Sequence, residues 1–434
     1  MKERTTCLIA GGGPAGMVLG LLLARAGVEV TVLEKHGDFL RDFRGDTVHP
    51  STLTLLDELG LGERFAALPQ SHVSQVRIPG PNGDEIVVAD LDRLRVTHPF
   101  IAMVPQWDLL DLLAHAARRE PTFRLRMETE VTGFVRESGH VVGVTYRTAQ
   151  GETGEVCAPL TVACDGRWSV THTLPGLRPR EMRVPIDAWW FRLPRRPEDD
   201  APALMPFANH GHFAVVVPRT NFFQVAFVGP KGEDDRLRAR GIEAFRREVA
   251  ALIPPLADRV EALASMDDVK HLDVRLNRLR RWHLDGLLCI GDAAHAMSPV
   301  GGVGINLAVQ DAVAAAKVVA EPLRRLGRVS PRRLAWVRRR RLAPTVAVQQ
   351  LQRVLHRAVL EPILEGRRSG PPARALTVLQ RFPALTLVPA YLIGVGLRPE
   401  HAPDFARRHS EGLQVGEDRH TSGLLSGSAA SGGA

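Results

Sequence analysis

Apolar runs alternate with glycine-rich and polar stretches at the start of the chain. The run from Cys7 to Ala10 is continuously apolar and predicts a buried strand. The glycine-rich turn Gly11–Gly16, an apolar helix and a second apolar run, Val28 to Leu33, follow it. Runs apolar at every position are typical of parallel strands covered on both faces. The order strand, glycine turn, helix and strand therefore predicts a βαβ unit of an α/β fold.

Periodicity and turn residues predict further elements along the chain. They are a helix over 52–59 capped by Ser51 and ended by Gly60, a strand pair within 73–101, a helix from Gln106 to about Arg119, strands over 123–127, 130–136, 141–147 and 160–163, a helix over 242–252, and strands over 269–276 and 286–291. Between 184 and 230, long alternating runs predict an antiparallel sheet with one covered face.

Beyond Asp311 the pattern is helical and strongly basic. The run Arg338 to Arg341 predicts the solvated face of a helix, with Leu334, Val337 and Leu342 pointing inward. The last residues, 421–434, are small and polar, which is typical of a disordered tail.

The glycine turn has the spacing of a dinucleotide-binding fingerprint. Gly11 allows the tight turn, Gly13 lets the backbone approach a pyrophosphate, and Gly16 lets helix and strand pack closely. The helix N-terminus offers free N–H groups and a positive dipole end to phosphates. Glu34, which ends the second strand, is placed to accept a hydrogen bond from a ribose hydroxyl, and an acid there disfavours a 2′-phosphate. The turn therefore predicts bound FAD or NAD.

Composition narrows the class of protein. The 434 residues suffice for two or three domains, and the net charge of +8 is carried almost wholly by arginine. Few aromatic residues interleave with the basic runs, so anionic cofactors explain the charge better than a nucleic-acid partner. The four cysteines have no CxxC spacing, which disfavours metal sites and disulfides and favours a reducing cytoplasm. The apolar stretch Met17–Leu23 is too short to span a bilayer. A cytoplasmic protein without a metal site or membrane span is expected.

Three later motifs, in this order, add a family resemblance: Cys164-Asp165-Gly166-Arg167-Trp168-Ser169, Gly291-Asp292-Ala293-Ala294-His295, and the stretch Met297–Asn306, MSPVGGVGIN. With the glycine turn, Glu34 and Arg44, they resemble the short, two-domain members of the class A flavoprotein monooxygenases, the para-hydroxybenzoate hydroxylase type. The resemblance covers about residues 5–320.

This resemblance implies an α/β fold: a Rossmann-like FAD-binding domain, an inserted antiparallel-sheet substrate domain and a helical C-terminal segment. The FAD-binding domain is expected over 1–75, 101–183 and 269–335, and the substrate domain over 76–100 and 184–268. A helical segment over 336–410 and a disordered tail over 411–434 complete the expected division.

The resemblance also implies a set of FAD-binding positions. They are Gly11, Gly13, Pro14, Ala15, Gly16, Glu34, Lys35, Arg44, Gln106, Val131, Asp165, Asp292, Pro299, Gly301, Gly302, Val303, Gly304, Ile305 and Asn306. Arg44 and Gln106 would reach the ribitol and phosphate region, Val131 the adenine, and Asp292 the ribitol. Pro299 and the backbone of 301–306 would lie along the isoalloxazine, where glycines let N–H groups and a helix N-terminus face its negative charge.

The implied activity is hydroxylation of an aromatic or polyketide-like molecule with NADPH or NADH, FAD and O2, through a flavin C4a-hydroperoxide. Such chemistry needs a dry, apolar pocket. Its candidate lining residues are Trp189, Phe213, Val215, Phe222 and Phe227. Only alternate positions of a strand can face a ligand, so about half of this set belongs to the core. Among His49, His210 and His212 the sequence does not single out a catalytic base.

Several alternatives stay open. The family usually has arginine where this chain has His172. This difference leaves the choice between NADPH and NADH as electron donor undecided. A local packing role for His172 is equally compatible. A flavin-dependent dehydrogenase or reductase, and a Baeyer–Villiger or epoxidising enzyme, fit the same motifs. A flavin halogenase is disfavoured because the WxWxIP stretch is absent. A regulatory FAD-binding protein is the non-enzyme alternative, and a monomer and a homodimer are equally compatible.

Overall fold

A six-stranded sheet, built from strands in both halves of the chain, organises the α/β part of the protein. The computed structural model describes residues 3–40, 46–79, 85–199, 204–209, 211–219, 221–368 and 370–409. The sheet is parallel except for its first edge strand. In spatial order its strands are β21 (His283–Leu284), β22 (Leu287–Cys289), β13 (Leu160–Ala163), β2 (Cys7–Ala10), β3 (Val30–Leu33) and β9 (Phe123–Arg126). The predicted buried parallel strands are confirmed.

Helices cover one face of this sheet. They are α1 (Pro14–Arg25), α4 (Gln106–Arg118) and α7 (Gly304–Leu326), with α1 packed between the other two. Their apolar faces and strands β2 and β3 form the largest core cluster, in which Met17, Leu19 and Val309 are fully buried. The core is continuous because α1 is apolar over nearly its whole surface.

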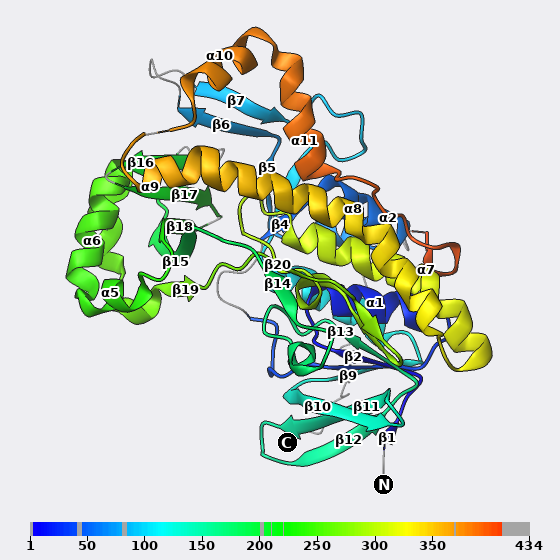
Figure 1. Cartoon of the computed structure of the whole chain (residues 1–434). Coiled ribbons are helices and arrows are strands. Elements are labelled where there is room, and N and C mark those ends of the chain that lie inside the picture. The colour runs from blue at the N-terminus through cyan, green and yellow to red at the C-terminus, as the bar shows by residue number, and fades with distance from the viewer. Residues whose placement is uncertain are drawn as a thin grey trace, which may run out of the picture.

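A second, four-stranded sheet covers the opposite face (Figure 1). Its strands are, in spatial order, β1 (Glu3–Arg4), β12 (Thr153–Cys157), β11 (His140–Thr148) and β10 (Thr129–Glu137). Strands β10 and β11 form a hairpin whose turn residues Ser138 and Gly139 both have positive φ, as a tight hairpin turn requires. The sequence pattern did not predict β12.

The predicted antiparallel sheet between 184 and 230 is confirmed. Its order is β16 (Met205–Asn209), β17 (His212–Pro218), β18 (Phe222–Pro230), β15 (Ile186–Pro194) and β19 (Lys270–Leu272). Helices α5 (Asp234–Ala239) and α6 (Gly241–Leu252) lie at its outer side. The strand predicted over 269–276 is shorter, because only β19 pairs, with β15.

Smaller elements connect the two regions. These are β4 (Thr47–Val48), β8 (Ile101–Met103) and β5 (Ser71–Val73) in one sheet, the pair β6 (Gln75–Pro79) and β7 (Glu85–Asp90), the pair β14 (Pro179–Glu181) and β20 (Asn277–Leu279), and helices α2 (Pro50–Glu58) and α3 (Gly62–Ala66). Ser51 is not the cap of α2: His49 precedes the helix, and Ser51 lies inside its first turn. Gly60 follows α2 with φ of +70°, as predicted for its end.

The C-terminal part is helical. It contains α8 (Pro331–Leu355), a π-helical turn (His356–Leu360), α9 (Glu361–Leu364), α10 (Ala373–Arg381) and α11 (Leu387–Gly394). In Figure 1, α10 and α11 lie at one end of the molecule beside β6 and β7. The predicted tail, 411–434, lies outside the described residues. Within the described ranges no single helix is long and apolar enough to cross a membrane. Only when they are taken together do α10 and the segment 383–394, which form a bent pair, reach that length and apolar composition.

The arginine run of α8 is not wholly solvated. Leu334 and Val337 point inward as predicted, but Arg341, on the same stripe, is also buried, with 1% of its surface exposed. Its charge is compensated because Arg341 Nε lies 3.1 Å from Asp311 Oδ1 and Arg341 Nη1 donates to the Arg398 carbonyl at 3.0 Å. A buried cation is tolerated only with such partners.

Candidate functional site

Four strand ends meet at one edge of the six-stranded sheet. Gly11 follows β2, Glu34 follows β3, Asp165 comes just after β13, and Gly291 comes just after β22. Backbone hydrogen bonds join these ends, because the Gly11 N–H donates to the Leu33 carbonyl and the Cys164 N–H donates to the Ala10 carbonyl. The carboxyl ends of parallel strands are where open α/β sheets bind ligands.

The glycine turn is held in shape by its neighbours. Gly11 has φ of +101°, and a side chain there would approach the Cys164 carbonyl to 2.5 Å. A side chain on Gly16 would meet the Gly11 carbonyl at 2.0 Å. The Glu34 carboxylate accepts the Gly12 N–H at 2.8 Å and the His36 N–H at 3.2 Å. Glu34 therefore fixes the glycine loop from the end of β3.

Two helix N-termini adjoin the strand ends. Helix α1 begins after Gly13 and helix α7 at Gly304, and neither first turn contains an acid. The two helices meet at Gly291, where an added Cβ would lie 3.4 Å from Ala15 and 3.3 Å from Ala308. Added Cβ atoms on Gly13 and Gly304 would meet no protein atom within 4 Å. This space, lined by free backbone donors, fits an anionic group such as a pyrophosphate.

Asp165 and Asp292 flank this space. Asp165 Oδ2 accepts the Val170 N–H at 2.9 Å, whereas its buried Oδ1 has no partner among the described residues. Burial raises the pKa of Asp165 despite its hydrogen bonds. Asp292 is half-buried and lies 3.6 Å from an Arg167 guanidinium nitrogen. An orphaned acceptor and a partly exposed carboxylate both suit hydroxyl donors, which the ribityl and ribose parts of FAD carry.

The turn before α7 is anchored from the other side. Its Gly302 carbonyl accepts bonds from Thr47 Oγ1 at 2.9 Å and from His49 Nε2 at 3.0 Å. The Asn306 side chain accepts from Ser51 and Thr52, both at 2.8 Å. The Asn306 carbonyl oxygen is thus already used inside the protein, whereas its amide nitrogen donates none of these bonds.

Side chains of α8 and of the π-helical turn after it also bind the turn before α7. The Gln352 amide donates to the carbonyls of Ser298 and Val300, at 2.8 and 2.9 Å. His356 Nε2 lies 2.9 Å from Ser298 Oγ, at the start of the π-helical turn. π-Turns are frequent at functional sites. The signal in the sequence is a polar stripe, Gln349, Gln352 and His356, on the buried face of a helix, which the sequence analysis missed.

A buried ionic network ties the strand end to the C-terminal segment. Asp311 accepts the Gly291 N–H at 3.1 Å, lies 2.5 Å from His295 Nε2 and pairs with Arg341. Glu400, whose side chain is fully buried, pairs with Lys317 at 2.9 Å and with Arg340. Sequence reasoning identified none of these pairs, because the partners are 16 to 83 residues apart.

One face of the five-stranded sheet packs against α5 and α6, and the opposite face packs against the turn before α7. Trp189 and Phe227 are fully buried on the α6 side, where Phe227 and Phe245 ring centres lie 5.3 Å apart. They belong to the core, as predicted for about half of the candidate lining residues. Phe213 and the unpredicted Trp190 are half-buried and pack, with Val300, against another cluster. The alternation of β15 and β17 decides which residues face the turn.

A polar contact joins the five-stranded sheet to Asp46, which lies just before β4. Arg219, 7% exposed, donates to Gln224 Oε1 at 2.8 and 3.0 Å and pairs with Asp46. Asp46 also accepts the Gln106 N–H at 3.3 Å. Burial raises the pKa of Asp46, although Arg219 opposes the shift. Arg44, the predicted arginine two residues earlier, lies outside the described residues.

The remaining predicted positions differ in placement. Val131 is buried beside Leu33 near the end of β3, and Lys35 is exposed. Pro299 accepts the Gly302 N–H in the turn, Gly301 is exposed, Val303 is buried and Ile305 packs against the main core. His172 Nε2 lies 3.0 Å from the Ala293 carbonyl, which supports its local packing role. Val215 packs beside Val217, and Phe222 stacks under Arg192 at 4.8 Å.

The histidines considered as bases are also placed. His49 has no exposed surface, and burial lowers its pKa to about 4, so it is neutral near pH 7 and anchors Gly302. His212 lies on β17, its ring centre 4.9 Å from that of Phe227. His210 lies outside the described residues.

His49 makes stability depend on pH. Its folded-state pKa is below 6.5, so protonation favours the unfolded chain, and stability is complete above pH 6.5 and falls as the pH drops towards 4. At pH 5 we expect a loss of roughly 2 kcal/mol from this residue. Urea unfolding of the wild type and His49→Gln between pH 7 and 5 tests this. The variant, which keeps an N–H donor, should have the shallower slope; equal slopes would refute the assignment.

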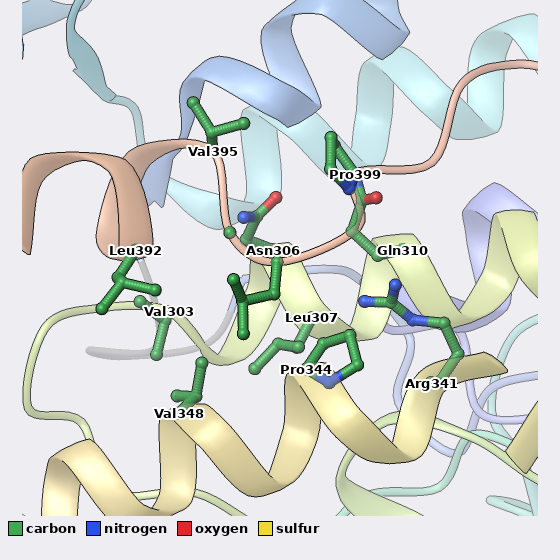
Figure 2. Close-up of a pocket in the computed structure, with 12 residues that line it drawn as sticks. Val303, Asn306, Leu307, Gln310, Arg341, Pro344, Val348, Leu392, Val395 and Pro399 are labelled. Carbon is green, nitrogen blue, oxygen red and sulfur yellow. The ribbon is translucent and has the colours of Figure 1, made fainter. Parts of the chain in front are cut away.

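The described residues offer neither a metal site nor a disulfide. No cluster of His, Cys, Asp or Glu there could hold a metal ion. The four cysteines are free, with Cys7 and Cys289 buried. Figure 2 shows a cavity between α7, α8 and the segment around Leu392 and Pro399. Its volume of about 10 Å³ holds at most one water, so it is a packing seam.

Comparison with known sequences agrees with this geometry. The profile of the FAD binding domain matches residues 4–351. The chain is 34% identical over 390 residues to 6-methylpretetramide 4-monooxygenase of Streptomyces rimosus, covering 88% of this chain and 90% of that enzyme.

Solved structures share the fold. OxyS anhydrotetracycline hydroxylase from Streptomyces rimosus has a TM-score of 0.70 at 24% identity, over 93% of this chain and 78% of that one. The flavin-dependent brominase Bmp2 has a TM-score of 0.73 at 17% identity, over 93% and 97% of the two chains. At these identities the likeness establishes the architecture, which hydroxylating and halogenating proteins both use.

Proposed function

Because this chain belongs to the FAD binding domain family and is an FAD-dependent monooxygenase with NAD(P)H as donor, we propose that it hydroxylates a fused-ring, polyketide-derived aromatic molecule. The observation that carries the substrate class is the 34% identity, over nearly the full length of both chains, to an enzyme named for 6-methylpretetramide. The balanced reaction consumes the aromatic C–H compound, O2, NAD(P)H and one proton, and yields the phenol, NAD(P)⁺ and water.

We assign the FAD site to the edge where the strand ends meet. Gly13 and the α1 N-terminus would hold the pyrophosphate, because the space beside Gly13 is open and no acid opposes an anion there. Glu34, which ends β3 beside the glycine turn, would accept a ribose hydroxyl. Asp165 and Asp292 offer acceptors to further hydroxyls.

When bound, FAD takes electrons from NAD(P)H and activates O2; the protein supplies position, dryness and electrostatics. The N-terminus of α7, which begins at Gly304, would favour negative charge beside it. Thr47, His49 and Gln352 keep that turn from moving through their bonds to its carbonyls. Phe213, Trp190 and Val300 would exclude water from the reacting ring.

The substrate would lie against the face of the five-stranded sheet that Phe213 and Trp190 occupy. This face is apolar at its centre and polar at one end, where Arg192 and Gln224 project from paired positions of β15 and β18. Trp190 Nε1 is buried without a partner among the described residues. An apolar centre with a few polar groups suits a fused-ring ligand that carries oxygen substituents. The division of the chain into domains given above stays a prediction.

Product analysis tests the proposal. Purified protein with FAD, NADPH or NADH and air is incubated with fused-ring aromatics and, for comparison, with simple phenols. A fused-ring product heavier by one oxygen atom, labelled from ¹⁸O2, is expected. Products lacking two hydrogens, or oxygenation of simple phenols alone, would overturn it.

Asp292→Ala is expected to purify with little FAD, since it loses an acceptor for ribityl hydroxyls. The flavin-to-protein absorbance ratio measures this. Asp285→Ala, a change of a partly exposed carboxylate paired with His140, serves as the control and should keep its flavin. Normal flavin content in Asp292→Ala would contradict the assignment.

Phe213→Ala is expected to raise KM for the aromatic substrate and the fraction of NAD(P)H oxidised without product. Its melting temperature should change little because Phe213 is half-buried. The matched variant Phe227→Ala removes a fully buried ring and should instead cost about 3–5 kcal/mol of stability. Equal effects on KM from both variants would refute the assignment of faces.

A further inference from the structure

Helices α10 and α11 and the turn between them expose several large apolar side chains. We define the α10–α11 surface as Val378, Phe382, Leu385, Val388 and Tyr391, whose exposed fractions are 47, 55, 44, 57 and 43%. The opposite side of these helices is packed: Leu376 and Ala390 are buried, and both helices contact β7. Exposed apolar residues gathered in this way mark an interaction site.

The segment that carries this surface contains charges of one sign only, although Arg367 pairs with Glu365 just before it. Residues 366–399 contain five arginines, at 367, 368, 374, 381 and 398, and no aspartate or glutamate. Arg374 and Arg381 are exposed on α10. With Val378 they occupy positions i, i+4 and i+7, which share one face of a helix. Cationic and apolar groups thus lie side by side.

We propose that the α10–α11 surface docks on an anionic lipid bilayer, with its apolar side chains at the boundary of the acyl chains and Arg374 and Arg381 at the headgroup phosphates. Interfacial helices combine the same two features. The segment Arg374–Gly394 contains an 18-residue window of mean hydropathy at least 1.2, with at most two charges, but it bends by 107°. A bent pair of short helices is too short to cross a bilayer as one helix, so it would lie on the surface.

Charge disfavours a second copy of this chain as the occupant. A two-fold contact places a surface against itself. Here it would bring Arg374 and Arg381 towards their own copies, and no acid in 366–399 would compensate. Anionic lipid supplies the opposite charge, and each arginine near such a surface contributes a roughly fivefold gain in binding.

The test is co-sedimentation of the full-length, FAD-loaded protein with phosphatidylcholine vesicles, with and without phosphatidylglycerol. Binding to the anionic vesicles that weakens as salt rises is expected. Phe382→Asp/Val388→Asp should abolish it, and Arg374→Gln/Arg381→Gln should weaken it about 25-fold. The matched controls are Leu326→Asp, at a 72% exposed leucine on α7, and Arg332→Gln/Arg333→Gln, at exposed arginines of α8. Both should bind like the wild type.

Flavin content and melting temperature establish that each variant is folded. Absence of sedimentation by the wild type, or equal binding by the surface variants and controls, would overturn the proposal. A dimer in light scattering that Phe382→Asp/Val388→Asp dissociates, with no vesicle binding, would assign the surface to a second copy and would also overturn it. None of these outcomes depends on turnover, so the membrane proposal and the proposed reaction fail separately.

Discussion

Replacing Asp311 with alanine is expected to lower the free energy of unfolding by about 3–5 kcal/mol, because Arg341 would remain buried without its nearer charge partner, with only Glu400, 3.9 Å away, to oppose its charge. Asp311 also holds the Gly291 N–H, so the strand end beside Asp292 loses an anchor. Urea denaturation of the FAD-free protein measures the loss. Glu321→Ala, which breaks an exposed i,i+4 pair with Arg325, is the control and should cost less than about 1 kcal/mol.

The double variant Asp311→Leu/Arg341→Met separates the charge from the volume. Replacing both partners by apolar groups should recover most of the lost stability. If the double variant were as unstable as Asp311→Ala, packing rather than an uncompensated charge would be responsible.

The Asp311–Arg341 pair also predicts that the wild-type protein loses stability in acid. Burial raises the pKa of Asp311, but His295 and Arg341 outweigh it and hold the pKa below 3.8. Stability from this group is therefore complete above that pH and lost below it.

Gly13→Val is expected to weaken FAD binding at least about 100-fold while the protein still folds. An added side chain meets no protein atom within 4 Å, and the backbone, at φ −71° and ψ −176°, is open to any residue. The side chain would instead fill the space assigned to the pyrophosphate and remove two or more charge-assisted N–H bonds, each worth about 1.5–3 kcal/mol. Flavin titration and the melting temperature of the FAD-free protein give the two readouts.

Two glycine controls frame this result. Gly370→Ala, also with open space around it, should change neither flavin affinity nor stability. Gly16→Ala should lose both, because its Cβ would lie 2.0 Å from the Gly11 carbonyl. Unchanged FAD affinity in Gly13→Val would remove the pyrophosphate from this helix N-terminus.

The sequence predicted the parts of the fold that local pattern controls. The βαβ unit, helix α4 and the antiparallel sheet follow from apolar runs, alternation and turn glycines within a few residues of one another. Gly11 was assigned correctly to a tight turn, and Gly16 to close packing of helix and strand, because an added Cβ on Gly16 would meet the Gly11 carbonyl and lie 3.3 Å from Ile9 of β2. The family resemblance added the cofactor and the activity, which periodicity alone does not give.

The remainder depends on contacts between distant segments. Trp189 and Phe213 are both aromatic residues on alternating strands, and only the position of α6 decides which one belongs to the core. The Asn306 side chain accepts bonds from Ser51 and Thr52 on α2, which lie 255 and 254 residues earlier, and no local pattern indicates these contacts. Arg341 lay within a basic run, and nothing near it in the sequence indicated the buried Asp311.

The contacts between the two ends of the described chain also constrain how it folds during synthesis. Arg25, at the end of α1, donates to the Ala406 carbonyl at 2.8 Å across 381 residues, and Glu58, at the end of α2, binds the N–H of Ala402. The ribosome must therefore release almost the whole chain before the first helices gain their last partners. Until then the apolar α1 lacks part of its cover, and contacts of such sequence separation form slowly. A nascent chain stalled before residue 398 should depend on chaperones in a way that the finished protein does not.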